Sequence, residues 1–114
     1  MHKVTTHKSC NYLNSKLDIE ATDDPGPGGA HNSYQITTTV ADYASKFCTI
    51  KFHTGDPKGI DGIKGISDET LLAVVIDRLK GFQKGKFGNE KIANALVRLE
   101  ECLMWLQSDL VDKV

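Results

Sequence analysis

The sequence lacks the features that would assign it to several common functional classes. Its charge is nearly balanced, with 14 Lys and Arg against 15 Asp and Glu and a formal net charge of −1. A protein that binds duplex nucleic acid normally carries a basic surplus, so we expect no duplex nucleic acid as a partner. No apolar run approaches the roughly 20 residues needed to cross a bilayer, and the polar N-terminus does not have the pattern of a signal peptide. We therefore expect no membrane partner and a cytoplasmic protein.

Cysteine is scarce. Cys10, Cys48 and Cys102 cannot all pair internally, and the simplest interpretation is reduced thiols in a cytosolic protein. His7 lies three residues before Cys10, a spacing that zinc can use, but a structural zinc ion needs four ligands. Neither Cys48 nor His53 forms a second close pair. We expect no metal site.

Catalytic motifs are also missing. The chain contains no Gly-x-Ser-x-Gly, no His-Glu-x-x-His and no paired His-x-Thr strands such as a small phosphodiesterase requires; His53-Thr54 occurs once. The glycine-rich loop that ends at Gly65-Ile66-Ser67 lacks the Gly-Lys-Ser/Thr of a P-loop, and Asp68 and Glu69 would repel a phosphate placed there. We expect no catalytic residues, no cofactor and no enzymatic activity.

The stretch from Ser67 to Leu110 has the pattern of two amphipathic helices joined by a short basic loop. The first helix is expected from about Asp68 to Phe82 with Ser67 as its N-cap, and the second from about Glu90 to Asp109 with Asn89 as its N-cap. Apolar residues recur on one face of each helix: Leu72, Val75, Ile76, Leu79 and Phe82, then Ile92, Ala95, Leu96, Leu99, Leu103, Leu106 and Leu110. Because the connecting loop is short, the helices should be antiparallel neighbours.

The first half of the chain predicts a sheet. Residues 1–15 are polar and suggest a loose arm or an edge strand. Three segments have the alternation or composition of strands: Lys16–Ala21, Ser33–Val40 and Lys46–Thr54. Both sides of the third are partly apolar, so we expect it to be central. Breaker residues predict a loop over Thr22–Asn32, and Ala41–Ala44 is expected to form a turn or a short helical segment.

A second glycine-rich loop, Gly55–Ile66, contains three Gly-Ile pairs spaced by three residues. We expect each Ile to anchor the loop to the core; three steps are too few for a repeat architecture. Since strands precede helices, the predicted class is α+β, with a small antiparallel sheet of three to four strands followed by a long antiparallel helical hairpin. We expect one domain, with the sheet over residues 16–54 and the hairpin over 67–112.

The loop between the helices has the ingredients of an anion site. Lys84 and Lys86 bring positive charge, and Gly85 and Gly88 leave the backbone uncovered. Asn89 lies where the second helix exposes its first N–H groups, which suit a phosphate.

Two aromatic residues, Phe82 and Phe87, flank this loop. A ring beside a phosphate site can stack a base, which contributes roughly 1–3 kcal/mol. The alternative is that Phe82 belongs to the apolar stripe, Gly85 ends the helix and the lysines are ordinary surface residues.

Two further groups of residues admit a functional interpretation. His31 and Tyr34 lie in or next to the Pro/Gly loop, which could close over a small polar ligand; equally, His31 and Asn32 could be ordinary turn residues. Trp105 lies off the main apolar stripe, in one row with Glu101 and close to Arg98. An exposed Trp on a long helix indicates a partner surface, so we expect a homodimer or a higher homo-oligomer through the helices.

Four stretches taken together are familiar: Gly28-Gly29-Ala30-His31-Asn32-Ser33-Tyr34, Leu71-Leu72-Ala73-Val74-Val75-Ile76-Asp77-Arg78-Leu79, Phe82-Gln83-Lys84-Gly85-Lys86-Phe87 and Leu99-Glu100-Glu101-Cys102-Leu103-Met104-Trp105-Leu106. In this order they resemble a family of small phage proteins that includes the first type of anti-Thoeris protein. The matching stretches lie between about residues 17 and 107.

The resemblance implies a nucleotide sponge rather than an enzyme. Such proteins bind cyclic ADP-ribose isomers, of the glycocyclic type, that bacterial TIR-domain defence proteins make, and they do not cleave them. Some members also hold cyclic oligonucleotides at separate sites in an oligomer built from dimers. The implied location is the cytoplasm of the infected bacterium. The alternative function is a structural or protein-binding module that uses the helical hairpin as a docking face.

Carried over by position, Phe82 matches the family's ring in Phe-Gln-x-Gly and is the expected base-stacking residue, while Gln83 and Lys84 follow it in register. Ile92 stands where the family pattern has an Asn, and the chain after Leu106 lacks the family's arginine-rich tail. The expected ligand-binding set is Phe82, Gln83, Lys84, Gly85, Phe87, Asn89, His31, Tyr34 and Arg98.

Overall fold

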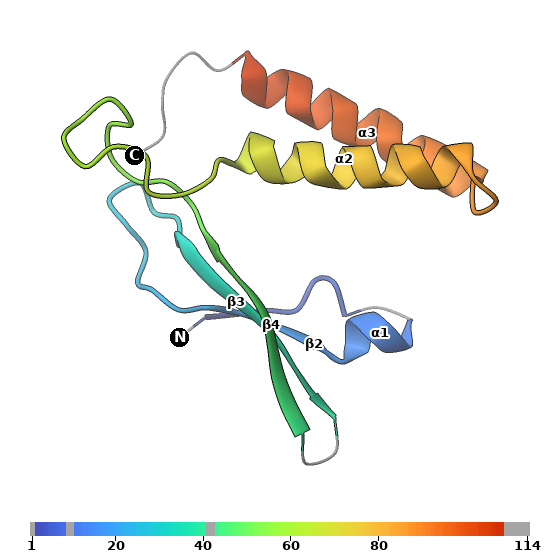
Figure 1. Ribbon diagram of the computed structural model, residues 1–114, viewed down its shortest axis with the longest axis horizontal. Coiled ribbons are helices and arrows are strands. Elements are labelled where there is room, and N and C mark those ends of the chain that lie inside the picture. The colour runs from blue at the N-terminus through green and yellow to red at the C-terminus, as the bar shows by residue number, and fades with distance from the viewer. Residues whose placement is uncertain (1, 9–10, 41–42, 109–114) are drawn as a thin grey trace. The chain divides into compact units, whose positions relative to one another are not determined.

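The computed structural model describes residues 2–8, 11–40 and 43–108 (Figure 1). The chain divides into a sheet unit that extends to Gly65 and a hairpin unit that begins at Ile66. A four-stranded antiparallel sheet is thus followed by two packed long helices, which confirms the predicted α+β class. That the whole chain forms one domain stays a prediction.

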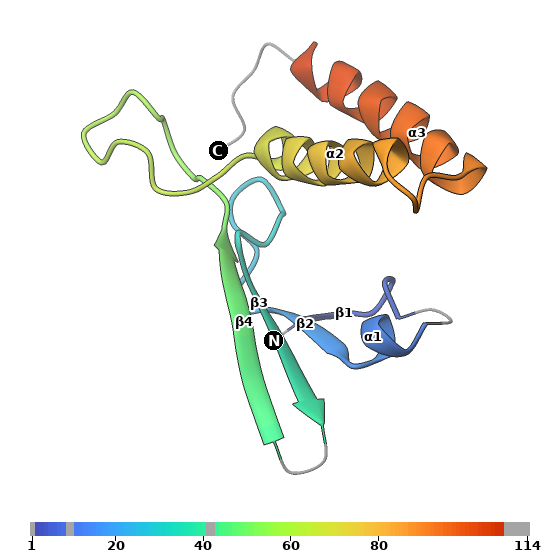
Figure 2. The ribbon, with the colours of Figure 1, turned by 45° about the vertical axis from the view of Figure 1, so that its right-hand side comes forward.

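The sheet is an antiparallel meander in the order β1-β2-β3-β4 (Figure 2). Its strands are β1 (His2–Val4), β2 (Leu17–Ala21), β3 (Ser33–Val40) and β4 (Tyr43–Lys51). Between β1 and β2 the chain forms a short helix, α1 (Tyr12–Ser15). The arm predicted over residues 1–15 therefore contains an edge strand, since β1 pairs with β2 through His2 and Ala21.

Strand β3 has the predicted bounds, but the strand after it differs from the prediction. Tyr43 and Ala44 belong to β4 instead of a turn or helical segment, because Val40 pairs directly with Tyr43 and leaves only two residues to connect the strands. Those two, 41 and 42, lie outside the described residues. At the other end β4 stops at Lys51, three residues before the predicted end.

The prediction that this strand is central is wrong. In the described part of the chain, β4 pairs only with β3 and ends the sheet. The register shifts beside Ile36, which pairs with Cys48, while Thr37 pairs with Lys46. Phe47 is therefore the extra residue of a bulge, and its side chain is 59% exposed. Apolar residues on both sides of this strand reflect exposure at an edge rather than two sheet neighbours.

The Gly/Ile loop is attached to the sheet unit by backbone contacts and by His53. The Nδ1 atom of His53 accepts a hydrogen bond from the Lys64 N–H (3.0 Å), and its Nε2–H donates to the Gly55 carbonyl (3.0 Å). A Cβ at Gly65 would lie 2.5 Å from the Lys51 carbonyl oxygen, so only glycine allows this close approach.

The expectation that each Ile anchors this loop is wrong for two of the three. Ile60 is fully exposed and Ile63 is 78% exposed, and only Ile66 is half-buried. The reason is the path of the backbone. Successive turns are closed by the N–H groups of Gly59 and Gly62, and Gly62 adopts a φ of +66°. These turns direct the side chains of Ile60 and Ile63 outward.

The hairpin unit consists of α2 (Asp68–Lys84) and α3 (Glu90–Gln107), which lie side by side and run antiparallel (Figures 1 and 2). Both predicted N-caps are confirmed. Ser67 Oγ accepts the Thr70 N–H (3.1 Å), and Asn89 Oδ1 accepts the Ile92 N–H (2.8 Å). The helix α2 runs two residues past its predicted end, and the predicted end of α3 at Asp109 lies outside the described residues.

The predicted apolar stripes form the contact between the helices, with two exceptions. Ile76 and Leu96 are buried at its centre, and the half-buried members are Leu72, Leu79, Phe82, Ile92, Leu99, Leu103 and Leu106. Val75 and Ala95 are exposed. Each of these two residues directly precedes a buried residue and is turned about 100° away from it around the helix axis. Because a single neighbouring helix covers only the middle of the stripe, both residues stay exposed. Leu110 lies outside the described residues.

Among the described residues, no helix combines the length and the apolar character that crossing a bilayer requires.

Candidate functional site

Two aromatic rings define the loop between α2 and α3. Phe82 lies in the last turn of α2 and is half-buried, whereas Phe87 lies in the loop and is 61% exposed. Their ring centroids are 6.1 Å apart at an interplanar angle of 80°, an edge-to-face contact. Phe82 therefore packs in the apolar stripe and also contributes to the surface of the loop. Its place in the apolar stripe is thus confirmed, and its role in stacking a base stays a prediction.

Each ring carries a cation on its face. The guanidinium carbon of Arg78 lies 4.7 Å from the centroid of Phe82, and the ammonium group of Lys86 lies 5.4 Å from the centroid of Phe87. Both distances are within the range of a cation–π interaction. Arg78 was not among the predicted site residues. The signal was present, however, because Arg78 precedes Phe82 by four residues and the two therefore share one face of the helix.

The amides of the loop hold its backbone in shape. Gln83 Oε1 accepts the backbone N–H of Asn89 (3.0 Å), and Asn89 Nδ2 donates to the Phe87 carbonyl (3.3 Å). A Cβ at Gly88 would lie 2.5 Å from the Gln83 carbonyl oxygen, so the loop backbone is close against the end of α2. Gln83 and Asn89, both predicted to touch a ligand, thus also hold the loop in shape. The sequence predicted the N-cap role of Asn89 but not these two hydrogen bonds.

The remaining predicted residues of the loop are exposed. Lys84 is the last residue of α2, where its charge is favourable at the negative end of the helix dipole. Gly85 follows as the C-cap, and its N–H donates to the Phe82 carbonyl (3.1 Å). Together with Arg78 and Lys86, Lys84 gives the loop three positive charges beside two aromatic rings, a composition suited to a flat, anionic molecule.

Arg98 is not brought to this loop. It lies nine residues after Asn89 on α3, roughly 13.5 Å along the helix axis. Its guanidinium is 4.0 Å from the Glu101 carboxylate in an exposed i,i+3 pair. Such pairs contribute little to stability.

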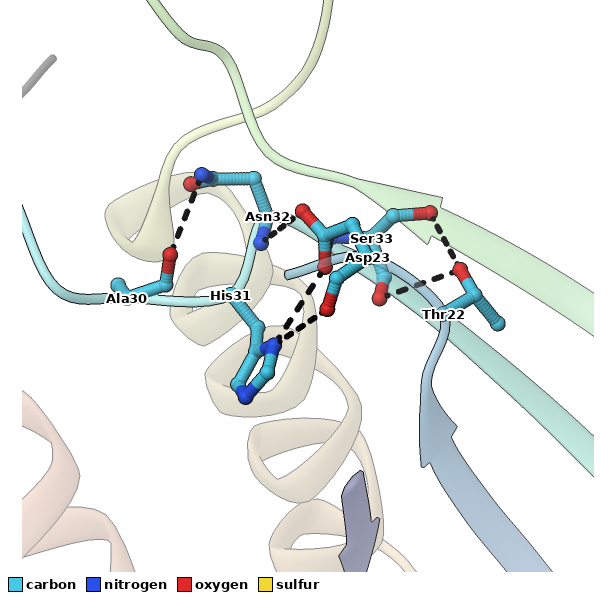
Figure 3. Close-up of polar contacts among 6 residues, drawn as sticks. All are labelled: Thr22, Asp23, Ala30, His31, Asn32 and Ser33. Atoms are coloured by element: carbon cyan, nitrogen blue, oxygen red, sulfur yellow. Dashed lines mark hydrogen bonds and ion pairs between the residues drawn. The ribbon is translucent and has the colours of Figure 1, made fainter. Parts of the chain in front are cut away.

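In the sheet unit, His31 is held by the loop that precedes β3 (Figure 3). Its Nδ1–H donates to the Asp23 carbonyl (2.7 Å) and lies 3.6 Å from the Asp23 carboxylate. That carboxylate also accepts the backbone N–H groups of Asn32 (2.9 Å) and Ser33 (3.2 Å). The Asn32 N–H is the main reason why the pKa of Asp23 is lowered, and Ser33 and His31 act in the same direction.

Aromatic contacts continue from His31 along the sheet unit. Its ring stacks on His2 with centroids 5.0 Å apart and meets Tyr34 edge-on at 6.4 Å. Tyr34 in turn meets Phe52 edge-on at 6.0 Å. The structure therefore brings His31 and Tyr34 to each other, but in a different unit from Phe82. Their role toward a ligand stays a prediction.

A cleft of about 270 Å³ lies on the sheet unit, over β1, β2 and β3. No sequence signal pointed to it. Its lining includes Lys3 and Glu20, together with an ion pair between Lys8 and Asp18 (2.9 Å). Since both signs of charge line the cleft, it has no evident preference for an anion.

Two of the three thiols can be placed. Cys48 and Cys102 are free and exposed, whereas Cys10 lies outside the described residues, and with it the His7–Cys10 pair. His7 itself contacts the Leu17 carbonyl through Nε2 (2.6 Å). Among the described residues, no three His, Cys, Asp or Glu side chains are grouped to hold a metal ion.

The amino-acid sequence matches a known protein family. The profile of the Acb2/Tad1 hairpin domain matches residues 46–109, which is more than half of the chain. The chain belongs to the Acb2/Tad1 hairpin-domain family. It is also 40% identical over 88 residues to Thoeris anti-defense 1 of Bacillus phage SBSphiJ7. This alignment covers 77% of the chain and 58% of that protein, so the chain spans less than two thirds of the relative's length. The resemblance stated from the sequence is confirmed.

Proposed function

We propose that this protein captures a cyclic nucleotide immune signal and holds it without cleaving it. It would act as a phage anti-defence protein in the cytoplasm of the infected bacterium. Two findings support the proposal: membership in the Acb2/Tad1 hairpin-domain family and similarity to a phage protein named Thoeris anti-defense 1. The proposed ligand is a cyclic ADP-ribose isomer of the glycocyclic type, with cyclic oligonucleotides as a second class.

The observation that carries the proposal is the pair of rings at the loop, each with a cation beside it. An adenine can stack on Phe82, and the pyrophosphate can take donors from the exposed side chains of Lys84 and Lys86. Phenyl rings stack and amides form hydrogen bonds, but neither group takes up or releases a proton near neutral pH. The composition of the loop therefore favours holding a ligand over cleaving it.

Within this site the proposed contacts differ in kind. Phe82 and Phe87 supply stacking surface, whereas Gln83 and Asn89 fix the loop through their mutual hydrogen bond (3.0 Å). The Gln83 amide still carries two N–H donors that suit ribose hydroxyls. His31 and Tyr34 belong to the sheet unit and Arg98 lies further along α3, and all three stay proposed contacts.

We further propose that the protein is a homodimer or a higher homo-oligomer through its helices. Val97, Met104 and Trp105 lie at i, i+7 and i+8 on one face of α3, and they are 59%, 55% and 66% exposed. A row of exposed apolar side chains at this spacing is typical of a helix that packs on a partner. The same row supports the alternative function, a docking module without a ligand.

Binding measurements on a Phe82→Ala variant separate these functions. A panel of cyclic nucleotides is added to the purified protein, and thermal shift and calorimetry report binding. Loss of stacking of roughly 1–3 kcal/mol predicts that Phe82→Ala lowers the affinity about 5- to 150-fold.

The matched control is Phe47→Ala, which removes an exposed ring from the sheet unit and should leave binding unchanged. If no member of the panel stabilises the wild type, or if Phe82→Ala binds as well as the wild type, the proposed site is wrong.

A further inference from the structure

We infer that Arg78 makes the loop site selective for bases that carry a phosphate. In the free protein its guanidinium covers the Phe82 ring, and in the complex it leaves the ring to bind the phosphate while the base takes its place. This inference rests on the proposed function, and it adds a specificity-determining residue to the same site.

The first observation is that the ring face is already occupied. Arg78 and Phe82 are one helical turn apart on α2, and the guanidinium carbon lies 4.7 Å from the ring centroid. Phe87 makes the other aromatic contact with this ring, an edge-to-face pair with centroids 6.1 Å apart. A base that stacks on Phe82 from the side of Arg78 must therefore displace the guanidinium.

The second observation is that Arg78, like Lys84, Lys86 and Lys91, has no carboxylate partner among the described residues, unlike two other cations of the hairpin. Lys80 lies 4.0 Å from the Glu100 carboxylate, and Arg98 lies 4.0 Å from that of Glu101. Within residues 2–8, 11–40 and 43–108, Arg78 forms no ion pair, and its side chain is exposed. The positive charge of Arg78 thus lies against the Phe82 ring and is available to an anion.

The third element is the chemistry of the guanidinium group. It is planar, so its face stacks on a ring while its edge keeps five N–H donors in a fork that matches two phosphate oxygens. A phosphorylated ligand replaces the lost contact with the ring by a charge-assisted pair. A nucleoside without a phosphate also displaces the guanidinium from the ring but offers it no new partner. Arg78 would thus discriminate against unphosphorylated bases.

The test compares two probes on the full-length protein. The first is the mixture of cyclic ADP-ribose isomers that a TIR-domain enzyme makes from NAD⁺, and the second is adenosine. We expect Arg78→Met to weaken binding of the first about tenfold or more, because a charge-assisted bidentate pair is lost. The variant should bind adenosine at least as well as the wild type does, because the guanidinium no longer covers the Phe82 ring.

Three further variants make the outcome specific. Arg78→Lys keeps the charge but not the fork, and it should recover only part of the affinity. Lys80→Met removes a positive charge two residues away and should change the affinity for either probe less than about twofold. Phe82→Ala should weaken the binding of both probes. Circular dichroism confirms that each variant is folded. The second measurement is the salt dependence of binding, which should be shallower in Arg78→Met than in the wild type.

The failures of this inference and of the proposed function are distinguishable. If Arg78→Met binds the cyclic isomers within twofold of the wild type while Phe82→Ala does not, the role of Arg78 is overturned and the site stands. Full affinity of Arg78→Lys would overturn the role of the planar fork. If the wild type binds no cyclic isomer, both proposals are wrong.

Discussion

Two alanine substitutions of glycine in the hairpin unit should have opposite effects on its stability. Gly81 lies inside α2, and a Cβ there would meet no atom within 4 Å. Gly88 lies in the loop, where a Cβ would be 2.5 Å from the Gln83 carbonyl oxygen and 3.3 Å from its Cα. The same chemical change therefore probes free space in one place and a close backbone contact in the other.

The magnitudes follow from these surroundings. Gly81→Ala removes backbone freedom from the unfolded chain and should raise the free energy of unfolding by about 0.5–1 kcal/mol. Gly88→Ala forces the loop away from α2, because the nearest atoms are backbone and cannot rotate aside, and overpacking of this kind costs about 1–3 kcal/mol. The shift also strains the hydrogen bond from the Asn89 N–H to Gln83. The two variants should thus differ by about 1.5–4 kcal/mol.

Urea unfolding of both variants and the wild type provides the measurement. Circular dichroism at the helical band follows α2 and α3, the long helices of the described chain. Fluorescence of Trp105, the single Trp of the sequence, reports on the hairpin unit alone. If Gly88→Ala is as stable as the wild type, the loop is not packed against the end of α2 and the geometry proposed for the site is refuted.

Three further predictions concern other parts of the chain. Gly65→Ala should destabilise the sheet unit by about 1–3 kcal/mol because its Cβ would meet the Lys51 carbonyl oxygen at 2.5 Å; thermal unfolding followed by near-UV circular dichroism would detect it, and an unchanged midpoint would contradict it. The folded pKa of Asp23 is lowered mainly by the Asn32 N–H, so its contribution to stability is complete above the unfolded value, about 3.9, and is lost as the pH falls through the lower folded value. Asp23→Asn should therefore lower stability at neutral pH and flatten the acid limb of a stability–pH curve, and a parallel curve would argue against this role. Trp105→Glu should reduce the mass of the assembly in light scattering, whereas an unchanged mass would exclude this face of α3 from the interface.

The helical hairpin could be predicted because its determinants are local. The caps Ser67 and Asn89 and the 3.6-residue spacing of apolar side chains act within a few residues of the helices they define. The presence of Phe82 and Phe87 together at the loop was predictable for the same reason, since the two residues are close in sequence. Their role toward a ligand stays a prediction. Arg78 was missed although its spacing to Phe82 is also local, because an exposed Arg on a helix usually faces solvent alone.

Features that depend on distant contacts were harder to predict. The position of β4 at the edge of the sheet follows from its register with β3 and from the bulge at Phe47, neither of which has a strong local signature. The exposure of Ile60 and Ile63 follows from the path of the loop backbone, which turns at Gly59 and Gly62 and then approaches Lys51 closely at Gly65. Composition alone indicated that these isoleucines were buried, and the path of the backbone decided otherwise.

The fate of the captured molecule is the most direct test of the central claim. The protein is incubated with the cyclic ADP-ribose isomers that a TIR-domain enzyme makes from NAD⁺, separated from unbound nucleotide by gel filtration, and heated until it denatures. Mass spectrometry of the released material then compares its mass and its retention time with the input. We expect the bound fraction to return as the intact cyclic molecule, and Phe82→Ala to retain little of it. Recovery of a linear, hydrolysed nucleotide, or of none from the wild type, would contradict the account.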